Sequence, residues 1–246
     1  MVFCDTHIHL LAPEWIEPAQ RRIETAADSG IELLLQPGVR SGDWDKLIDL
    51  AQRHQTVYAA PGLHPMSAAE WNASRSARLR ELCCLSEVIA LGEIGLDALL
   101  DVDPQLQEQA FSGQVEIAIA AGLPVLIHCR KKIGQVLGIL RQSGVGKVGG
   151  ILHGFSGSVE TARQATELGL LVGVGPVLLR ENTRRLPEVV KAIPAAALVL
   201  ETDAPDMATG PEVLIEVAEK VAELRGWTLA ETAKITTANA RRILKL

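Results

Sequence analysis

The segment Val2-Phe3-Cys4-Asp5-Thr6-His7-Ile8-His9 decides which fold class the sequence predicts. It begins as a short apolar strand and ends in an acidic residue and two histidines. An open, doubly wound sheet normally carries a glycine-rich phosphate turn directly after its first strand. The polar run Asp5–His9 stands in place of that turn. The segment therefore argues against the doubly wound alternative.

Seven more short apolar runs, rich in branched residues, follow along the chain and alternate with helical patterns. Runs of this kind are typical of parallel strands covered on both faces. The predicted strands are Val2–His7, Ile31–Gln36, Val57–Leu63, Val88–Ile94, Pro124–Cys129, Gly149–His153, Leu170–Gly175 and Leu198–Asp203. The predicted helices are Glu14–Ser29, Asp43–His54, Arg75–Glu87, Asp103–Ala121, Lys131–Ser143, Ser158–Leu168, Glu181–Ala192 and Pro211–Arg225.

Eight strands alternating with eight helices in 246 residues predict a (β/α)8, TIM-like barrel of the α/β class. No linker, repeat or shift in composition divides the chain, so we expect a single domain over residues 1–246. The tail, Thr228–Leu246, is predicted to add two short C-terminal helices. The first is capped by Thr228, with Glu231 three residues further on.

Composition narrows the class of protein. Hydrophobic residues make up 48% of the chain, which excludes a disordered chain. A net charge of −6 argues against nucleic-acid binding driven by overall charge, although a local basic rim stays open. We expect no signal peptide and no membrane-spanning stretch, and four cysteines without CxxC spacing are typical of a reducing compartment. We expect a cytoplasmic protein that needs no membrane and no obligate protein partner.

Histidines and carboxylates recur where the predicted strands end. In a barrel these ends form one face, which is where active sites are built. His54 is the exception among the six histidines, because it ends a predicted helix and there meets the helix dipole. The residues expected on that face are His7, His9, His64, Glu93, His128, His153 and Asp203.

Taken singly, these residues are weak evidence. His7 and His9 point to the same side of a strand, but one core and one exposed histidine would fit equally well. Glu93 inside an apolar strand is costly unless it binds metal or pairs with a cation, for which Arg130 is the candidate. Asp5 shares the parity of the first two histidines and is expected to orient one of them.

The set as a whole is stronger evidence than its members. Six ligands are too many for one tetrahedral site with an open position, and they suit two metal ions that share a bridging carboxylate. Zinc fits histidine-rich ligation, with manganese, nickel, cobalt or magnesium as alternatives. Glu201 is an alternative to Asp203 as the inward carboxylate, but it lies deeper in the strand. The expected ligands are His7, His9, Glu93, His128, His153 and Asp203.

Six motifs, in this order, resemble those of the TatD-related metal-dependent hydrolases, within the wider amidohydrolase-like barrel group. The resemblance covers essentially the whole chain, and Asn239–Leu244 is similar to the closing helix of that family. The motifs are Asp5-Thr6-His7-Ile8-His9-Leu10, Gly62-Leu63-His64-Pro65, Leu91-Gly92-Glu93-Ile94-Gly95-Leu96-Asp97, Ile127-His128-Cys129-Arg130, His153-Gly154-Phe155-Ser156-Gly157 and Glu201-Thr202-Asp203-Ala204-Pro205.

The resemblance implies a role for each matching residue. His7, His9 and Asp203 would hold one metal ion, His128 and His153 the other, and Glu93 would bridge them. His64 would face the substrate or the attacking water, and Arg130 and Ser156 would touch an anionic group. The implied reaction is hydrolysis of ester bonds by metal-activated water, above all the phosphodiesters of DNA, with Asp203, His64 and Glu93 as catalytic residues. The implied partner is an anionic, phosphate-containing substrate such as single-stranded DNA.

The chain also departs from that family. The loop Asp206–Pro211 is short and has no basic residue, and Ala98-Leu99-Leu100 stands where the family usually has tyrosines. These departures keep open a metal-dependent amide, lactone or carboxylic-ester hydrolase acting on a small molecule, and more distantly a noncatalytic metal-binding protein. Lys131 and Lys132 could form a phosphate-steering patch or equally a solvated helix start. Trp15, Trp44 and Trp71 could stack nucleobases, but packing of the helix ends on the barrel is the preferred interpretation.

Overall fold

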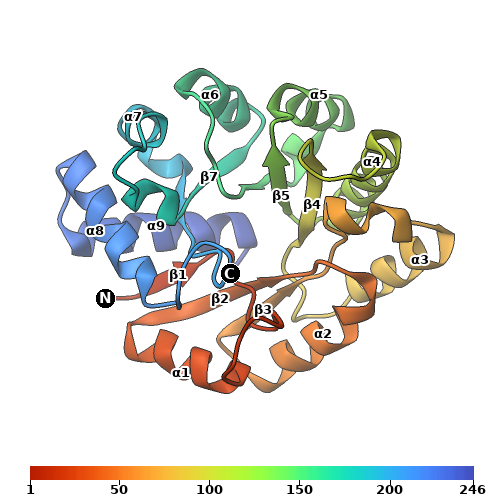
Figure 1. Cartoon of the computed structure of the whole chain (residues 1–246), viewed down its shortest axis with the longest axis horizontal. Helices are drawn as coiled ribbons and strands as arrows, with labels where there is room; N and C mark the ends of the chain where they lie inside the picture. Colours follow the sequence, from red (N-terminus) through yellow and green to blue (C-terminus); the bar gives the residue numbers. More distant parts are fainter.

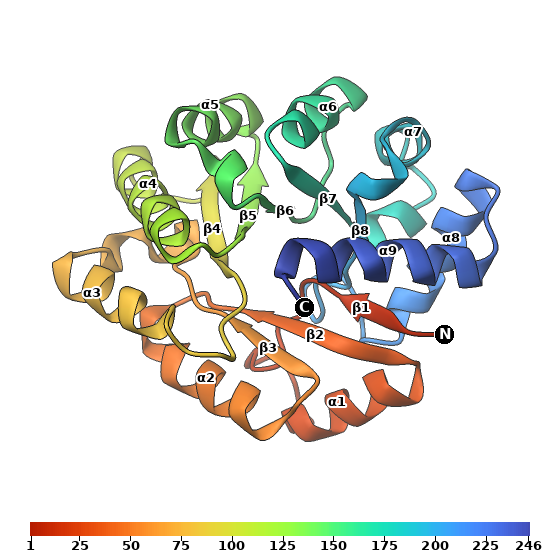
Figure 2. The same cartoon turned by 180° about the vertical axis from the view of Figure 1, so that it is seen from behind.

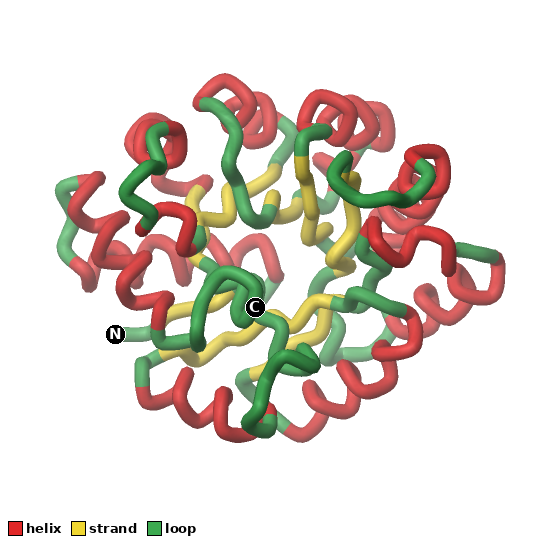
Figure 3. The backbone as a smooth tube through the Cα atoms, in the orientation of Figure 1, coloured by secondary structure: helices red, strands yellow, loops and turns green.

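Eight parallel strands line the centre of the molecule, and helices surround them (Figure 1; Figure 3). The computed structural model describes residues 1–246. The strands are short, which leaves several of the expected site residues beyond their ends. They are β1 (Phe3–Asp5), β2 (Ile31–Pro37), β3 (Val57–Ala60), β4 (Leu91–Asp97), β5 (Val125–Arg130), β6 (Gly150–Leu152), β7 (Leu170–Val174) and β8 (Leu198–Leu200).

The strands form two parallel sheets that close on each other. One sheet has the order β1-β2-β3 and the other β4-β5-β6-β7-β8. A bridge between Ala59 and Val88 joins the sheets on one side. On the other side, the backbone N–H of Thr6 donates to the carbonyl of Leu200 at 3.0 Å. This closure confirms the predicted (β/α)8 barrel and excludes the open, doubly wound sheet.

Helices follow the strands as predicted, with some shifted boundaries. The side chains of Asp103 and Ser158, where two helices were predicted to begin, cap α4 and α6. The first helix begins at Ala19, later than predicted, because the segment before it contains Pro13 and Pro18. The helices are α1 (Ala19–Asp28), α2 (Trp44–Arg53), α3 (Ala73–Leu82), α4 (Pro104–Ala121), α5 (Ile133–Ser143), α6 (Val159–Glu167), α7 (Arg185–Ala192), α8 (Val213–Arg225) and α9 (Leu229–Leu244).

The C-terminal tail forms one helix, α9, so the prediction of two short helices is wrong. The predicted capping box between Thr228 and Glu231 is present. No glycine or proline interrupts the 16 residues of α9, and buried residues recur along its full length. Figure 2 shows α9 crossing in front of the strands when the molecule is seen from behind.

Two apolar layers hold the barrel. A cluster of 53 buried residues lies between the strands and the surrounding helices, and a second cluster of 13 fills the barrel. Ala240, Ile243 and Leu244 of α9 belong to the inner cluster, so this helix closes one end of the barrel. The site residues occupy the other end. No helix has the length and apolar character that a membrane crossing would need.

Candidate metal centre

Backbone hydrogen bonds join the segments that follow β1 and β8. The N–H of Asp203 donates to the carbonyl of His7 at 2.8 Å, and the N–H of His9 donates to the carbonyl of Ala204 at 2.9 Å. These bonds place the two histidines and the carboxylate on adjoining backbone. His7 is fully buried, and the side chain of Asp203 is 15% exposed. Residues almost two hundred positions apart thus lie side by side in one site.

Glu93 lies at the centre of the site, and its two oxygens face different imidazoles. Its Oε2 lies 3.4 Å from Nε2 of His7 and 3.8 Å from Nε2 of His9. Its Oε1 lies 2.7 Å from Nδ1 of His128 and 3.7 Å from Nε2 of His153. One carboxylate therefore spans two groups of nitrogen ligands.

The local shape of β4 puts Glu93 there. The register between β4 and β5 shifts between Gly92 and Ile94, so Glu93 stands in a bulge without a direct partner. The two strands also approach very closely around it. A Cβ on Gly92 would lie 2.5 Å from the Leu126 side chain, and one on Gly95 would lie 1.9 Å from a backbone oxygen. Glycine is required at both positions because any side chain would separate the strands.

Asp203 is the second carboxylate of the site. Its Oδ1 lies 3.6 Å from Nε2 of His7 and 3.4 Å from Nε2 of His9, and its Oδ2 lies 3.6 Å from Nε2 of His153. The six predicted ligands therefore meet in one place. Groups able to share a metal ion include His7 with His9 and Glu93, and His7 with His153 and Asp203.

His64 also reaches the site. Its Nε2 lies 4.0 Å from Oε1 of Glu93, and its Nδ1 accepts a hydrogen bond from the N–H of Met66. Burial lowers the pKa of this imidazole to about 4, so the ring is neutral at physiological pH. His64 groups with Glu93 and His128 as a possible ligand set, in addition to the substrate-facing position expected for it.

Burial and neighbouring charges shift the pKa values of the site residues in opposite directions. Burial by itself would raise the pKa of Glu93, but the surrounding imidazoles hold it well below its usual range. Burial favours the neutral form of His153, yet the carboxylates of Glu201, Asp203 and Glu93 raise its pKa to about 10. The ionised carboxylates need positive charge nearby, which protonated imidazoles or bound cations can supply.

The donor atoms fit a divalent transition metal. Nε2 of His7 and Nε2 of His9 lie 3.1 Å apart, and the rings of His7 and His153 stack with centroids 3.5 Å apart. Nδ1 of His7 is buried and has no hydrogen-bond partner. Converging nitrogens and carboxylate oxygens with few partners of their own form a mixed ligand set of the kind that zinc and similar ions take.

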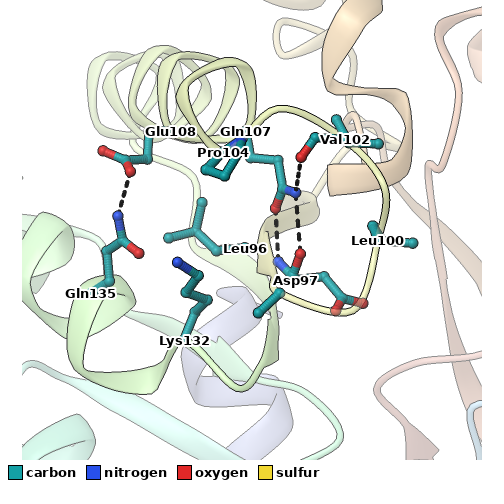
Figure 4. A pocket seen from close by; sticks show the side chains of 10 residues that line it. Leu96, Asp97, Leu100, Val102, Pro104, Gln107, Glu108, Lys132 and Gln135 are labelled. Carbon is teal, nitrogen blue, oxygen red and sulfur yellow. Dashed lines mark hydrogen bonds between the residues drawn. The ribbon is translucent and has the colours of Figure 1, made fainter.

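Sequence analysis did not assign a role to Asp97. This buried carboxylate lies with Oδ2 3.1 Å from Nε2 of His128, opposite the nitrogen that faces Glu93. The backbone of Asp97 is held by the buried side chain of Gln107, which accepts from its N–H and donates to its carbonyl (Figure 4). A carboxylate on the far nitrogen of a ligand histidine orients the ring. Its only signal in the sequence was its place in the motif Leu91–Asp97, because the predicted strand ended at Ile94 whereas β4 extends to Asp97.

Two further acidic residues, Glu201 and Asp206, lie next to the predicted ligands. Glu201, considered as an alternative ligand, is fully buried, and its Oε1 lies 3.2 Å from Nδ1 of His153. It therefore stands behind that imidazole. Asp206, which the sequence did not single out, groups with His9 and Asp203 as a possible ligand set and is exposed.

Asp5 does not orient an imidazole, contrary to expectation. Its oxygens accept hydrogen bonds from the hydroxyl and N–H of Thr202 and from the N–H of His7. Asp5 thus links the end of β1 to the segment after β8. The expectation failed because β1 ends at Asp5, so the alternation of side-chain direction within a strand does not extend to His7. Burial raises the pKa of the Asp5 carboxyl to about 7.

The expected substrate-binding residues lie beside the centre. Arg130 and Ser156 line a cleft of about 350 Å³ together with His128, His153 and Asp203. A second cleft, of about 470 Å³, is lined by His9, His64 and Glu93 and by residues of the loops after β1 and β2. The metal centre lies between the two clefts and is open to both.

The tryptophans pack around the site. Trp44 is buried and its Nε1 donates to the carbonyl of Gly62, while Nε1 of Trp15 donates to the carbonyl of His9 at 2.8 Å. Trp71 is partly buried against the apolar core. These contacts favour a structural role, and Trp15 fixes the backbone of a site histidine.

Comparison with known proteins agrees with this geometry. The family model "TatD related DNase" matches residues 4–245. The chain belongs to this family. It is 33% identical to the metal-dependent hydrolase YabD of Bacillus subtilis (strain 168), covering 98% of each chain. It is 30% identical to the 3'-5' ssDNA/RNA exonuclease TatD of Erwinia tasmaniensis, over 98% of this chain and 99% of that protein.

A solved structure shows the same fold. The TatD homologue YjjV of Escherichia coli K12 superposes with a TM-score of 0.93 at 30% identity, covering 99% of this chain and 98% of that one. These matches confirm the predicted family and the prediction of a metal-dependent hydrolase. Together with the ligand clusters, they show a metal-binding enzyme of this family.

Proposed function

We propose that this protein hydrolyses phosphodiester bonds of single-stranded DNA with two divalent metal ions, zinc in the first instance. One observation carries the proposal: the two oxygens of Glu93 face separate sets of imidazole nitrogens. This is the arrangement expected of a carboxylate shared by two ions. A nuclease substrate is supported by the relative from Erwinia tasmaniensis, which is named an exonuclease of single-stranded DNA and RNA.

The proposed ligand sets are those that the motifs of the family imply. His7, His9 and Asp203 would hold one ion, His128 and His153 the other, and Glu93 would belong to both. When bound, the ions supply positive charge to the developing phosphoryl oxygens and lower the pKa of water. Zinc is favoured by the number of imidazoles, with manganese, nickel, cobalt and magnesium as the alternatives.

Protein groups would complete the reaction. Asp203, ionised because its imidazole neighbours lower its pKa despite burial, would accept a proton from the attacking water and pass it to the leaving oxygen. Arg130 and Ser156 line the cleft next to this carboxylate and would hold phosphate oxygens. His64, neutral and on the opposite side of Glu93, would donate or accept a hydrogen bond at the substrate.

A second candidate is hydrolysis of a small carboxylic ester, lactone or amide. The exposed apolar side chains near the site favour it: Leu99 is 60% exposed and lines the first cleft, and Met66 is 42% exposed and lines the second. The loop Asp206–Pro211 also has no basic residue. A small apolar substrate would need no cations there.

Elemental analysis of the gently purified protein, combined with activity assays, tests the proposal. We expect two divalent ions per chain and hydrolysis of single-stranded DNA that stops after chelation and returns with added metal. Activity on simple carboxylic esters but on no phosphate ester would instead support the second candidate. Neither metal nor any hydrolysis would overturn both.

We also propose that residues 1–246 form one catalytic domain and that the protein works in the cytoplasm. The hydrogen bond from the N–H of Thr6 to the carbonyl of Leu200 closes the ring of strands between β1 and β8, which supports the domain assignment. The four free cysteines support a reducing compartment.

A further inference from the structure

The loop after β7 carries three arginines that sequence analysis did not assign. Arg180 follows the 3₁₀ turn Pro176–Leu179, and Arg184 and Arg185 lie at the start of α7. All three are exposed, and none of them forms an ion pair. In a protein with a net charge of −6, cations that gather without acidic partners indicate a place for an external anion.

Three hollows connect these arginines to the metal centre. The first cleft holds Arg180 together with His153 and Asp203. A neighbouring hollow of about 250 Å³ is lined by His153 and Arg185, and a third of about 290 Å³ by Arg184 and Arg185. Ser156 lines all three, so they are adjacent. We call this path the basic track; its cations are Arg130, Lys131, Arg180, Arg184 and Arg185.

The cleft on the other side of the centre has the opposite charge character. Its wall includes Glu14, Asp43 and Asp206 as well as Arg40 and Lys46. Lys46 is already paired with Asp43 at 3.2 Å. Arg40 is the one cation of this wall without an ion pair, whereas none of the three arginines of the β7 loop is paired, so the two clefts are not equivalent for an anionic chain.

Lys131 and Lys132 are adjacent in sequence but line different hollows. Lys131 lines the basic track, whereas Lys132 lines a separate hollow of about 130 Å³ between α4 and α5, near Glu108 and Gln135 (Figure 4). Only the first of the two lysines is therefore placed to contact the same ligand as the arginines.

We infer that the basic track binds the phosphate backbone of single-stranded nucleic acid and leads it into the metal centre. The inference rests on the proposed function, because it assumes a polynucleotide substrate. The ligand side chains are at most 15% exposed, so a flexible single strand can enter where a duplex would be held away. The track supplies the cations that the loop Asp206–Pro211 lacks, since they come from the loop after β7 instead.

The test is a triple variant, Arg180→Gln with Arg184→Gln and Arg185→Gln. Its matched control replaces three exposed arginines that line none of these hollows: Arg80→Gln with Arg141→Gln and Arg163→Gln. The probe is a fluorescein-labelled oligothymidylate of about 16 nucleotides, within the site sizes usual for single-strand binders. Fluorescence anisotropy is measured with the metal removed by chelation, so that the probe stays intact.

We expect the track variant to bind the probe at least about tenfold more weakly than the control. The slope of log affinity against log salt should also fall by about two, because each lost phosphate contact contributes about 0.7 on single strands. Equal affinities and equal slopes in the two variants would overturn the inference. A loss of the same size in both variants would overturn it as well, because it would report net charge only.

Kinetics of the metal-loaded proteins separate this inference from the proposed function. In the track variant, kcat/KM should fall much more for the oligonucleotide than for bis(4-nitrophenyl) phosphate, which is too small to reach along the track. Equal losses on both substrates would overturn the inference while leaving the phosphodiesterase intact. If the unmodified protein hydrolyses neither substrate, the proposed function fails, and the anisotropy comparison still decides whether the track binds the strand.

Discussion

The two ends of the barrel differ in how their buried groups contribute to stability. At the end where the strands begin, α9 covers the opening with Ala240, Ile243 and Leu244, and Asn239 donates to the carbonyls of Ala195 and Leu198. At the other end, imidazoles and carboxylates face one another at 2.7–4.0 Å, and Nδ1 of His7 has no partner. The first end gains stability from apolar burial and satisfied hydrogen bonds. The second holds buried polar groups whose cost a ligand must offset.

Replacing Glu93 should have the largest effect, because this residue faces both ligand groups. In Glu93→Ala we expect hydrolysis to fall about 10³-fold or more, given that a single electrostatic contact in an active site is worth about 10²–10³. Metal content, measured by elemental analysis, should fall with it. Glu116→Ala, an exposed residue of α4, is the control. A fully active Glu93→Ala protein would end the two-metal proposal.

Asp203→Asn should separate proton transfer from metal binding. We expect at least one ion to remain, because the histidines are untouched, while turnover falls about 10²–10³-fold, within the usual range for general-base catalysis. Rates and metal content are measured on the same preparation. Asp28→Asn, which changes an exposed residue of α1, is the control and should leave turnover unchanged. The assignment of Asp203 as base fails if its variant keeps normal turnover.

Ile243→Ala tests the opposite end of the barrel. Removing a buried side chain from the inner cluster should lower the free energy of unfolding by about 2–3 kcal/mol. Below the melting transition, metal content and kcat/KM should stay at the values of the unmodified protein. Thermal or denaturant unfolding measures the loss, with the exposed Lys234→Ala of the same helix as control. A lower metal content in folded Ile243→Ala would show that the two ends are coupled.

Asp97→Asn should give the smallest effect of the four. Its carboxylate orients His128 from behind, and loss of such a partner usually weakens metal affinity about 10–100-fold. We expect a loss near the lower limit for one of the two ions, because asparagine can still accept a hydrogen bond. Competitive metal titration measures it, with the exposed Asp101→Asn as control. Unchanged affinity for both ions would leave Asp97 a purely structural role.

Much of the centre could be predicted from sequence because strand ends in a barrel converge. Short apolar runs followed by His7, His128, His153 or Asp203 were enough to expect these side chains together. Side-chain direction was harder to predict. The parity argument holds only inside a regular strand, and β1 ends at Asp5, so this carboxylate faces Thr202 and not an imidazole.

The residues that contact the predicted metal ligands could not be predicted from the local sequence pattern. Asp97 of β4 contacts His128 of the neighbouring strand β5, and Gln107 of α4 binds the backbone of Asp97. The basic track depends on a loop whose path has no periodic signal, and its arginines are spaced irregularly. The number of C-terminal helices was predicted wrongly, although the lack of glycine and proline in α9 was visible in the sequence.

By itself, the sequence determined the barrel, the family and the residue types that meet at the metal centre, because alternating apolar runs and polar strand ends are local properties of the chain. Only the tertiary structure decided which oxygen of Glu93 faces which imidazoles, what stands behind each histidine, and where unpaired cations gather. Those properties depend on distances between segments far apart in sequence. Such distances are set by strand register, by bulges and by the paths of loops, which no local pattern specifies.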